Sequence, residues 1–379
     1  MSQTPVRIIG AGIGGLTLAR CLLRHGIPSI VYERMPSTPR HAYGITLHKS
    51  SYLPLLQILG LDEWTFKRRI AVDGSVGGCG KIDPNVTATQ SPYLDSTSFR
   101  AHREKFERLL QEGLDIQWGH ALDQVKESPL GMTVCLQNGQ QLQSACIVGV
   151  DGPHSNTRKS FLPNTPLDVL PFVAFNGRRQ IKRVDFDKLY SPAMGESSII
   201  ETRVGDVVLH ISVNDYVGQN VSISWIYSRP ARGSSDPLYK PNRPVSGATD
   251  IPEEFYEEIK AISGLEAPFS DIFDADKLQM ERFLHWLMRT VLVGQRELDA
   301  FAKKGVFFMG DSVHAQPILG GNGANGAILD GIGLAKCIAA SGADGISSWY
   351  AAMYPEWEKG LHKSVQAIEE MHGARKLML

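Results

Sequence analysis

The sequence lacks the features that mark several large classes of protein. Its 379 residues include 39 Lys and Arg against 40 Asp and Glu, so the net charge of −1 offers no attraction for nucleic acid or an anionic membrane surface. No apolar run approaches the roughly 18 residues of a membrane span, and glycines at positions 10–15 interrupt the apolar stretch near the N-terminus. We therefore predict no nucleic-acid partner, no membrane span and no signal peptide.

Cysteine is also scarce. The five cysteines form no C-x-x-C pair, and their odd number does not suit a disulfide framework. They are Cys21, Cys79, Cys135, Cys146 and Cys337. We expect buried thiols in a reducing compartment, a cytoplasmic location and no metal site.

The sequence does contain a strand–turn–helix–strand unit at residues 6–34. Apolar residues 6–9 and 29–32 predict two buried strands, and residues 16–25 have the spacing of an amphipathic helix. Gly10, Gly12 and Gly15 form a G-x-G-x-x-G pattern between the first strand and the helix. This context is typical of a dinucleotide-binding fold, although a glycine-rich turn in an ordinary βαβ unit has the same pattern.

The residue types of this unit suit a dinucleotide. Gly10 allows a tight turn, Gly12 lets a pyrophosphate approach the backbone, and Gly15 lets the helix pack close to the strand. The helix N-terminus supplies free N–H groups and partial positive charge for phosphates. Glu33 ends the second strand, where its carboxylate can accept hydrogen bonds from ribose hydroxyls. We expect the adenosine half of the ligand here.

The rest of the chain divides by pattern. Residues 99–113 predict an amphipathic helix, residues 115–150 alternate like antiparallel strands with a turn at Asn138 and Gly139, and residues 71–98 suggest edge strands and a crossover. Four long alternating strands follow between residues 172 and 227, then a helix over 251–262. A buried strand over 305–309 precedes helices from about 327 to 371.

Two further motifs stand where strands end. D-G-x-x-S-x-x-R occupies residues 151–158, and G-D-x-x-H-x-x-P occupies 310–317, followed by G-x-G-x-N at 321–325. With the glycines at 10–15, this ordered set resembles the single-component FAD-dependent aromatic hydroxylases, the group typified by para-hydroxybenzoate hydroxylase. Residues 44–49 and 321–325 look closest to the tetracycline-inactivating monooxygenases and related fungal and bacterial enzymes.

The resemblance covers nearly the whole chain and implies an α/β fold. We expect a Rossmann-like FAD-binding domain with an inserted antiparallel-sheet substrate domain and a C-terminal helix. The implied boundaries are 1–72, 99–170 and 290–340 for the FAD-binding domain, 73–98 and 171–289 for the substrate domain, and 341–379 for the helical segment.

The resemblance also implies an activity. NADPH, or NADH, would reduce the FAD, and molecular oxygen would then supply one atom, through a flavin C4a-hydroperoxide, to an aromatic, enolic or indolic small molecule. Two alternatives stay open: a flavin dehydrogenase or reductase of the same fold, and a non-catalytic nucleotide-binding module.

Sixteen residues are implied to hold the cofactor. They are Gly10, Gly12, Gly14, Gly15, Glu33, Arg34, Arg40, Gly44, Arg103, Asp151, Asp311, Pro317, Gly321, Gly323, Ala324 and Asn325. Asp311 would accept hydrogen bonds from the ribityl hydroxyls, or cap a helix. Pro317 would lie beside the flavin ring, or only make a turn rigid. Backbone N–H groups of residues 321–324 would approach the pyrimidine edge of the flavin, with the next helix adding positive potential.

Several charged side chains have a simpler explanation than a role at the cofactor. Arg103 matches the arginine of the resembled group that reaches the FAD, and Arg40 is a similar candidate. The alternatives are a solvated helix face for Arg103 and a solvated loop for Arg40. Arg158 belongs to the motif that serves FAD and NADPH in the resembled group, or makes a surface salt bridge. His314 is expected to be structural rather than catalytic.

The expected substrate-facing residues lie on the long strands. Many aromatic hydroxylases of this group carry an arginine where this chain has Asn176, so Arg178 is the candidate to replace it. Tyr227 on a later strand is a third candidate. Because strand side chains alternate between faces, each of the three can instead point outward or pack in the core.

Overall fold

The G-x-G-x-x-G unit begins a five-stranded parallel sheet. In the computed structural model, which describes residues 4–38, 42–86, 97–129 and 131–373, the unit forms β1 (Val6–Ile9), α1 (Ile13–Arg24) and β2 (Ser29–Glu33), as predicted. The sheet also contains β5 (Ile116–Trp118), β9 (Ile147–Gly149) and β17 (Val306–Phe308), in the order β17-β9-β1-β2-β5. The last strand comes from residues almost 300 positions after the first.

Close backbone contacts fix α1 against this sheet. A Cβ added at Gly15 would lie 2.0 Å from the carbonyl oxygen of Gly10, so only glycine allows this approach. Gly10 itself has a φ of +114°, which a residue with a side chain rarely adopts. On its other side, α1 packs against α13 (Gly323–Ser341).

The predicted helix at 99–113 is partly a strand. Residues Phe99–His102 form β4, which pairs antiparallel with β3 (Gly44–Leu47), and only Arg103–Gln111 form the helix α4. Phe99 and Ala101 are buried on one side of β4, which favours an extended chain over a helix at these positions. We call the two paired strands the β3–β4 ribbon. The helices α2 (Lys49–Leu59) and α3 (Glu63–Ile70) lie beside it.

Residues 115–150 contain the predicted hairpin and two strands of another sheet. β6 (Leu122–Ser128), β7 (Gly131–Leu136) and β8 (Gln141–Ser144) form an antiparallel sheet, with Gly139 at a φ of +89° in the predicted turn. β5 and β9 instead join the parallel sheet. The described part of 71–98 holds 3₁₀ turns at 74–76 and 84–86 and isolated bridges at Ala71 and Lys81 in place of the predicted edge strands.

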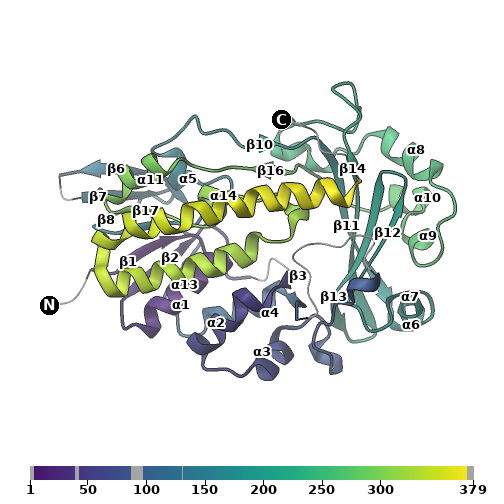
Figure 1. The fold of residues 1–379 in the computed structure, drawn as a ribbon, viewed down its shortest axis with the longest axis horizontal. Helices are drawn as coiled ribbons and strands as arrows, with labels where there is room; N and C mark the ends of the chain where they lie inside the picture. Colours follow the sequence, from purple (N-terminus) through teal and green to yellow (C-terminus); the bar gives the residue numbers. More distant parts are fainter. Residues whose placement is uncertain (1–3, 39–41, 87–96, 130, 374–379) are drawn as a thin grey trace.

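The long alternating strands form a second, antiparallel sheet, as predicted. Its order is β12-β13-β14-β11-β15, with β11 at Phe172–Lys182, β12 at Ile199–Val204, β13 at Val207–Val217, β14 at Asn220–Pro230 and β15 at Phe283–Trp286. One apolar face packs against α8 (Glu253–Ala261), α9 (Phe269–Ile272) and α10 (Ala275–Gln279). Figure 1 shows these helices on the side of the sheet away from the parallel sheet.

Shorter elements complete the fold. They are α5 (Asn156–Lys159), α6 (Arg183–Leu189), α7 (Ser191–Met194), α11 (Gln295–Ala302), α12 (Asp311–His314) and the paired strands β10 (Asp168–Val169) and β16 (Arg289–Thr290).

The C-terminal helix α14 (Ile346–Met371) connects the two sheets (Figure 1). Trp349, Tyr350 and Trp357 are buried in the core around the parallel sheet, whereas Ile368 packs against Phe172 of β11. Within the described residues, one helical stretch, 323–371, is long and apolar enough to cross a membrane by length and composition alone, a test that core helices also pass.

Candidate active site

The first motif forms an open turn at the carboxyl edge of the parallel sheet. The Gly10 N–H donates to the Tyr32 carbonyl over 2.8 Å. Apart from its chain neighbours, no described residue has an atom within 4 Å of a Cβ added at Gly12, the N-cap of α1. The buried Glu33 carboxylate accepts from the backbone N–H of Ala11 (2.8 Å) and of Met35 (2.9 Å). The turn, the helix N-terminus and an acid therefore lie together, as a dinucleotide requires.

The third motif places a second carboxylate nearby. Asp311 begins α12 directly after β17, and a Cβ added at Gly323 would lie 3.5 Å from its Oδ1. Burial raises the pKa of Asp311, although His314 and Arg103 act to lower it. Within the part of the chain that the structure describes, Asp311 accepts no hydrogen bond, and it does not cap α12. Such a carboxylate suits ligand hydroxyl groups.

Small residues bring the first and third motifs into contact. A Cβ added at Gly14 would lie 3.2 Å from the Cβ of Ala327 in α13 and 3.3 Å from Met309, which follows β17. A Cβ at Gly310 would likewise lie 3.4 Å from Ala327. Residues separated by about 300 positions in the sequence thus meet near the N-termini of α1 and α13.

The second motif is built into the same edge. Asp151 follows β9 and accepts from the Ser155 hydroxyl and from the Thr157 N–H (3.0 Å), so its carboxylate stabilises the start of α5. Arg158 is 2% exposed and donates to the carbonyls of Ser312 and Pro153. Arg158 therefore joins the second motif to the third, and the surface salt bridge considered for it does not form.

Arg103 is held by its neighbours rather than solvated. Its Nε donates to Glu107 Oε1 over 2.8 Å, and its Nη1 donates to the Tyr43 hydroxyl. Burial alone would lower the pKa of Arg103, but Tyr43 and Glu107 raise it above its ordinary value. The Arg178 guanidinium lies 5.2 Å from the centre of the Tyr43 ring, so both arginines contact Tyr43.

Asn325 holds the glycine-rich loop against β3. Its Oδ1 accepts from the His48 N–H (2.9 Å) and the Ser51 hydroxyl, and its Nδ2 donates to the Thr46 carbonyl over 3.1 Å. These hydrogen bonds position residues 321–324, whose backbone is the part expected to approach the flavin. Ala324 lies in the first turn of α13, and Gly321 has a φ of +69°.

The remaining predicted cofactor residues are spread around this edge. Pro317 is buried before the 3₁₀ turn at 318–320, and Arg34 is exposed after β2. Gly44 begins β3, and its N–H donates to Asn214 Oδ1 of β13 over 3.0 Å. Arg40 lies outside the described residues.

The expected substrate-facing residues separate. Asn176 and Arg178 lie on the face of the antiparallel sheet that meets the β3–β4 ribbon. Tyr227 is fully buried on the opposite face, where its hydroxyl donates to Glu258, and burial and that carboxylate raise its pKa. This placement corrects the expectation that Tyr227 faces the substrate. Tyr227 pairs with Phe175, which is adjacent to Asn176 in β11 and therefore points to the opposite face of the sheet.

His314 has a partner that sequence spacing did not suggest. Its Nε2 lies 2.5 Å from Asp330 Oδ2, and the same carboxylate accepts from Gly310 N–H and Trp357 Nε1, each over 2.9 Å. Burial lowers the pKa of His314, but Asp330 raises it above its ordinary value. The pair is buried and joins α12, α13 and α14, which supports a structural role.

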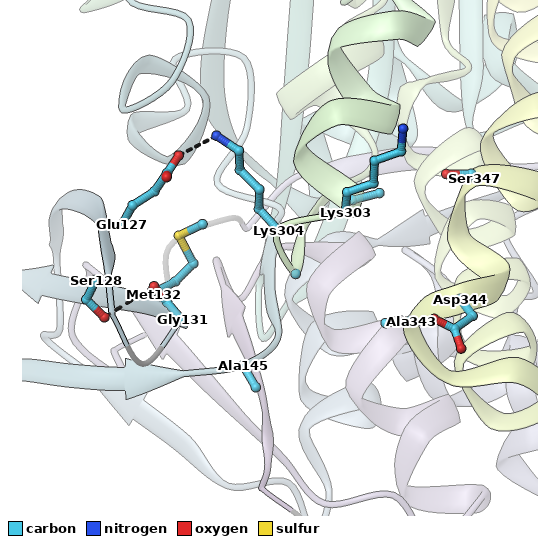
Figure 2. Close-up of a pocket in the computed structure, with 12 residues that line it drawn as sticks. Glu127, Ser128, Gly131, Met132, Ala145, Lys303, Lys304, Ala343, Asp344 and Ser347 are labelled. Atoms are coloured by element: carbon cyan, nitrogen blue, oxygen red, sulfur yellow. Dashed lines mark hydrogen bonds and ion pairs between the residues drawn. The ribbon is translucent and has the colours of Figure 1, made fainter.

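A surface cavity of about 720 Å³ lies elsewhere (Figure 2). Its lining includes Ala145 before β9, Gly305 before β17 and an ion pair between Lys304 and Glu127. These residues mark the amino ends of the parallel strands. Ligands of such sheets bind at the carboxyl ends, where the three motifs lie, so this cavity is not the candidate site.

Known proteins identify the fold and its cofactor. The family described as FAD binding domain matches residues 3–165 and 187–345. The chain belongs to this family. The FAD-dependent monooxygenase nscC of Aspergillus fumigatus is 36% identical over 394 residues, which cover 98% of this chain and 96% of nscC. The FAD-dependent monooxygenase adaC of Aspergillus niger is 33% identical, covering 97% of this chain and 93% of adaC.

A solved structure shares the architecture. The 2,6-dihydroxypyridine-3-hydroxylase of Arthrobacter nicotinovorans aligns with a TM-score of 0.73 and 16% identity, covering 99% of this chain and 94% of that one. The relatives and the family show that this chain is an FAD-dependent monooxygenase. The solved structure shows the same α/β FAD-binding fold with an antiparallel-sheet insertion. The open turn at Gly12 fits FAD, and so does the Asp311 carboxylate, which accepts no hydrogen bond from the described residues.

Proposed function

We propose that this monooxygenase uses NADPH, or NADH, to reduce FAD and transfers one atom of molecular oxygen to an aromatic, enolic or indolic small molecule. The name of the 2,6-dihydroxypyridine hydroxylase supports a ring substrate that carries acidic hydroxyl groups. No second G-x-G-x-x-G follows a strand, so the nicotinamide nucleotide would bind without a Rossmann unit of its own.

Residues of the three motifs would hold FAD along the carboxyl edge of the parallel sheet. Glu33 would accept from the adenosine ribose, the N-terminus of α1 would face the pyrophosphate, and Asp311 would accept from the ribityl hydroxyls. Backbone N–H groups of residues 321–324 would approach the pyrimidine edge. When bound, FAD supplies the electron transfer and the oxygen activation.

The β3–β4 ribbon is the observation that carries this proposal. On one side Asn325 binds the Thr46 carbonyl of β3. On the other side Arg100 of β4 donates to the Ser212 hydroxyl of β13 over 3.2 Å, and Gly44 donates to Asn214. The ribbon therefore joins the glycine-rich loop to the polar face of the antiparallel sheet, so a substrate on that face would lie next to the flavin.

Oxygen labelling tests the proposal. Purified holoenzyme should oxidise NADPH faster when a hydroxylated aromatic such as 2,6-dihydroxypyridine or a dihydroxynaphthalene is added, and mass spectrometry should find one atom of ¹⁸O from labelled O₂ in the product. Turnover without label would support the flavin dehydrogenase alternative. No NADPH oxidation with any such compound would contradict the proposal.

A further inference from the structure

The face of the antiparallel sheet that meets the β3–β4 ribbon carries polar residues at regular positions. In β13 the side chains of Leu209 and Ile211 are buried in the core under α8, so His210 and Ser212 lie on the other face. His210 is half-buried in a run, Val207–Asn214, whose other members are all buried. His210 is thus the one accessible position within this run of the strand.

Each of the other four strands has a residue in line with His210 that is also not fully buried. Strand register sets these positions side by side: Glu201 pairs with His210, His210 with Ile226, Ile226 with Asn176, and Asn176 with Leu284. We call Glu201, His210, Ile226, Asn176 and Leu284 the transverse row. None of its members is fully buried, whereas Leu209, Trp225, Tyr227 and Phe175, which alternate with them, are.

Contacts on both sides fix where the transverse row lies. Toward the cofactor, the next row contains Ser212 and Arg178, which contact Arg100 and Tyr43. Toward the C-terminus, the row beyond contains Ser228, whose hydroxyl lies 2.9 Å from Nε2 of His372 at the end of α14. The transverse row is therefore the accessible strip between the β3–β4 ribbon and α14.

At one end of this strip, His210 and Glu201 form an oriented pair. His210 Nδ1 lies 3.0 Å from Glu201 Oε1, and the two side chains are 14% and 9% exposed. An ionised carboxylate only accepts hydrogen bonds, so Nδ1 carries a proton, and the neutral form of such a ring has its lone pair on Nε2. In the described residues, Nε2 has no hydrogen-bond partner.

We propose that the transverse row is the floor of the substrate site and that His210 Nε2 binds an acidic hydroxyl group of the substrate. This inference rests on the proposed function. The substrate O–H bond breaks, its proton goes to Nε2, and the electron pair stays on the substrate oxygen as a phenolate or enolate. Glu201 stabilises the resulting imidazolium, while Ile226 and Leu284 contact the apolar ring. An oxygen anion makes the ring carbon more electron-rich, which favours attack on activated oxygen.

Among the described residues, three arginines on this face lie in or against the flanking rows. Arg178 and Arg100 lie toward the ribbon, and Arg203 donates to the His372 carbonyl over 3.0 Å on the side of α14. These arginines stabilise an anionic oxygen, but a guanidinium group cannot accept the proton of a substrate hydroxyl group. Within the row, the Glu201 carboxylate and the His210 ring contact each other directly, and His210 is the group that can accept the proton.

Binding of a coloured phenol tests the assignment without turnover. 4-Nitrophenol is titrated into the oxidised holoenzyme, without NADPH, at a pH where the free probe is mostly the neutral phenol. Difference spectra should show bound phenolate in the wild type. In H210Q the bound probe should remain neutral, and binding should weaken about tenfold or more through loss of a charge-assisted hydrogen bond. E201Q should lie between the two.

The control is H362Q, which changes an exposed histidine on α14 and should match the wild type. FAD content and thermal unfolding show whether each variant is folded, and E201Q alone decides the outcome if H210Q does not fold. Equal ionisation of the probe in the wild type and the folded variants, or no binding to the wild type, would overturn the assignment. If ¹⁸O labelling fails but H210Q still changes the probe's ionisation, the proposed function falls and the binding site stands.

Discussion

At the scale of single residues, Asp311 is the side chain on which FAD affinity should depend most directly. Its carboxylate is enclosed beside Gly323 and accepts no hydrogen bond from the described residues. D311N keeps the shape and removes the charge. Because hydrogen bonds to charged groups contribute about 1.5–3 kcal/mol, we expect FAD to bind roughly 10–100-fold more weakly. Flavin fluorescence during titration of the apoprotein measures the Kd.

D344N changes an exposed aspartate after α13 and is the matched control for that titration. An affinity of D311N equal to that of D344N would show that Asp311 does not bind the cofactor.

His285 gives a second residue-scale prediction, on stability. It is buried against Phe175, with neither ring nitrogen hydrogen-bonded in the described residues, and burial lowers its pKa to about 4. Because the unfolded state binds the proton more readily, stability is full above the ordinary histidine pKa of about 6.5 and falls as the pH drops toward 4. Because of His285, the free energy of unfolding should fall by about 2 kcal/mol between pH 7 and pH 5.

H285L removes this titration, so its unfolding free energy in urea should change less between pH 7 and pH 5 than that of the wild type. Equal changes in the two proteins would contradict the prediction.

At the scale of elements, Asp330 decides how α12, α13 and α14 fit together. It is 1% exposed and binds Gly310, His314 and Trp357 at once. D330N leaves a buried histidine without its charged partner, and we expect a loss of about 3 kcal/mol in the free energy of unfolding. The raised pKa of His314 makes the pair most stabilising below about pH 6.5 and weaker as the pH rises through the pKa in the folded state.

Urea denaturation of D330N at pH 6 and pH 9 checks both the size and the sign. W357F removes one neutral hydrogen-bond donor to the same carboxylate and part of a buried ring, so its cost should be the same at pH 6 and pH 9. A larger loss for D330N at pH 9 than at pH 6 would contradict the assigned direction.

At the scale of the whole molecule, α14 couples the two sheets. Its first half is part of the core around the parallel sheet, and Ile368 near its end packs against Phe172 of β11. I368A should lower the free energy of unfolding by about 2–5 kcal/mol, as truncation of a buried isoleucine does. It should also separate the release of FAD from the loss of β-structure on heating, which flavin fluorescence and circular dichroism follow independently.

K363A changes an exposed side chain of the same helix and should leave both transitions together at the wild-type temperature. If I368A unfolds in a single transition, α14 does not carry the coupling.

The sequence predicts well whatever depends on local spacing. The fingerprint at Gly10–Gly15, the long strands and the last helices follow from periodicity, because strand and helix periods are properties of neighbouring residues. The boundary between β4 and α4 was missed, since β4 depends on pairing with β3 and with Ala71 and Lys81, which are distant in the sequence.

Hydrogen-bond partners that depend on strand register or on tertiary contact could not be predicted from the sequence. The hydrogen bond between His314 and Asp330 and the one from Asn325 to β3 each join separate elements. Tyr227 was expected on the wrong face of the sheet. Alternation along β14 separates its residues into two faces, but the sequence does not say which of the two is buried. A usable signal existed for His210: apolar Leu209 and Ile211 alternate with polar His210 and Ser212, which indicates a polar face in β13.

The order of strands in the parallel sheet has a consequence for synthesis. β17 and α14 are made after the whole antiparallel sheet, yet the nucleotide-binding core needs both. A ribosome-bound chain that ends before residue 306 has the first glycine turn but neither Asp311 nor α13. The nucleotide-binding core therefore stays incomplete while the inserted sheet is made, and FAD can be captured only after residues 306–341 have left the ribosome.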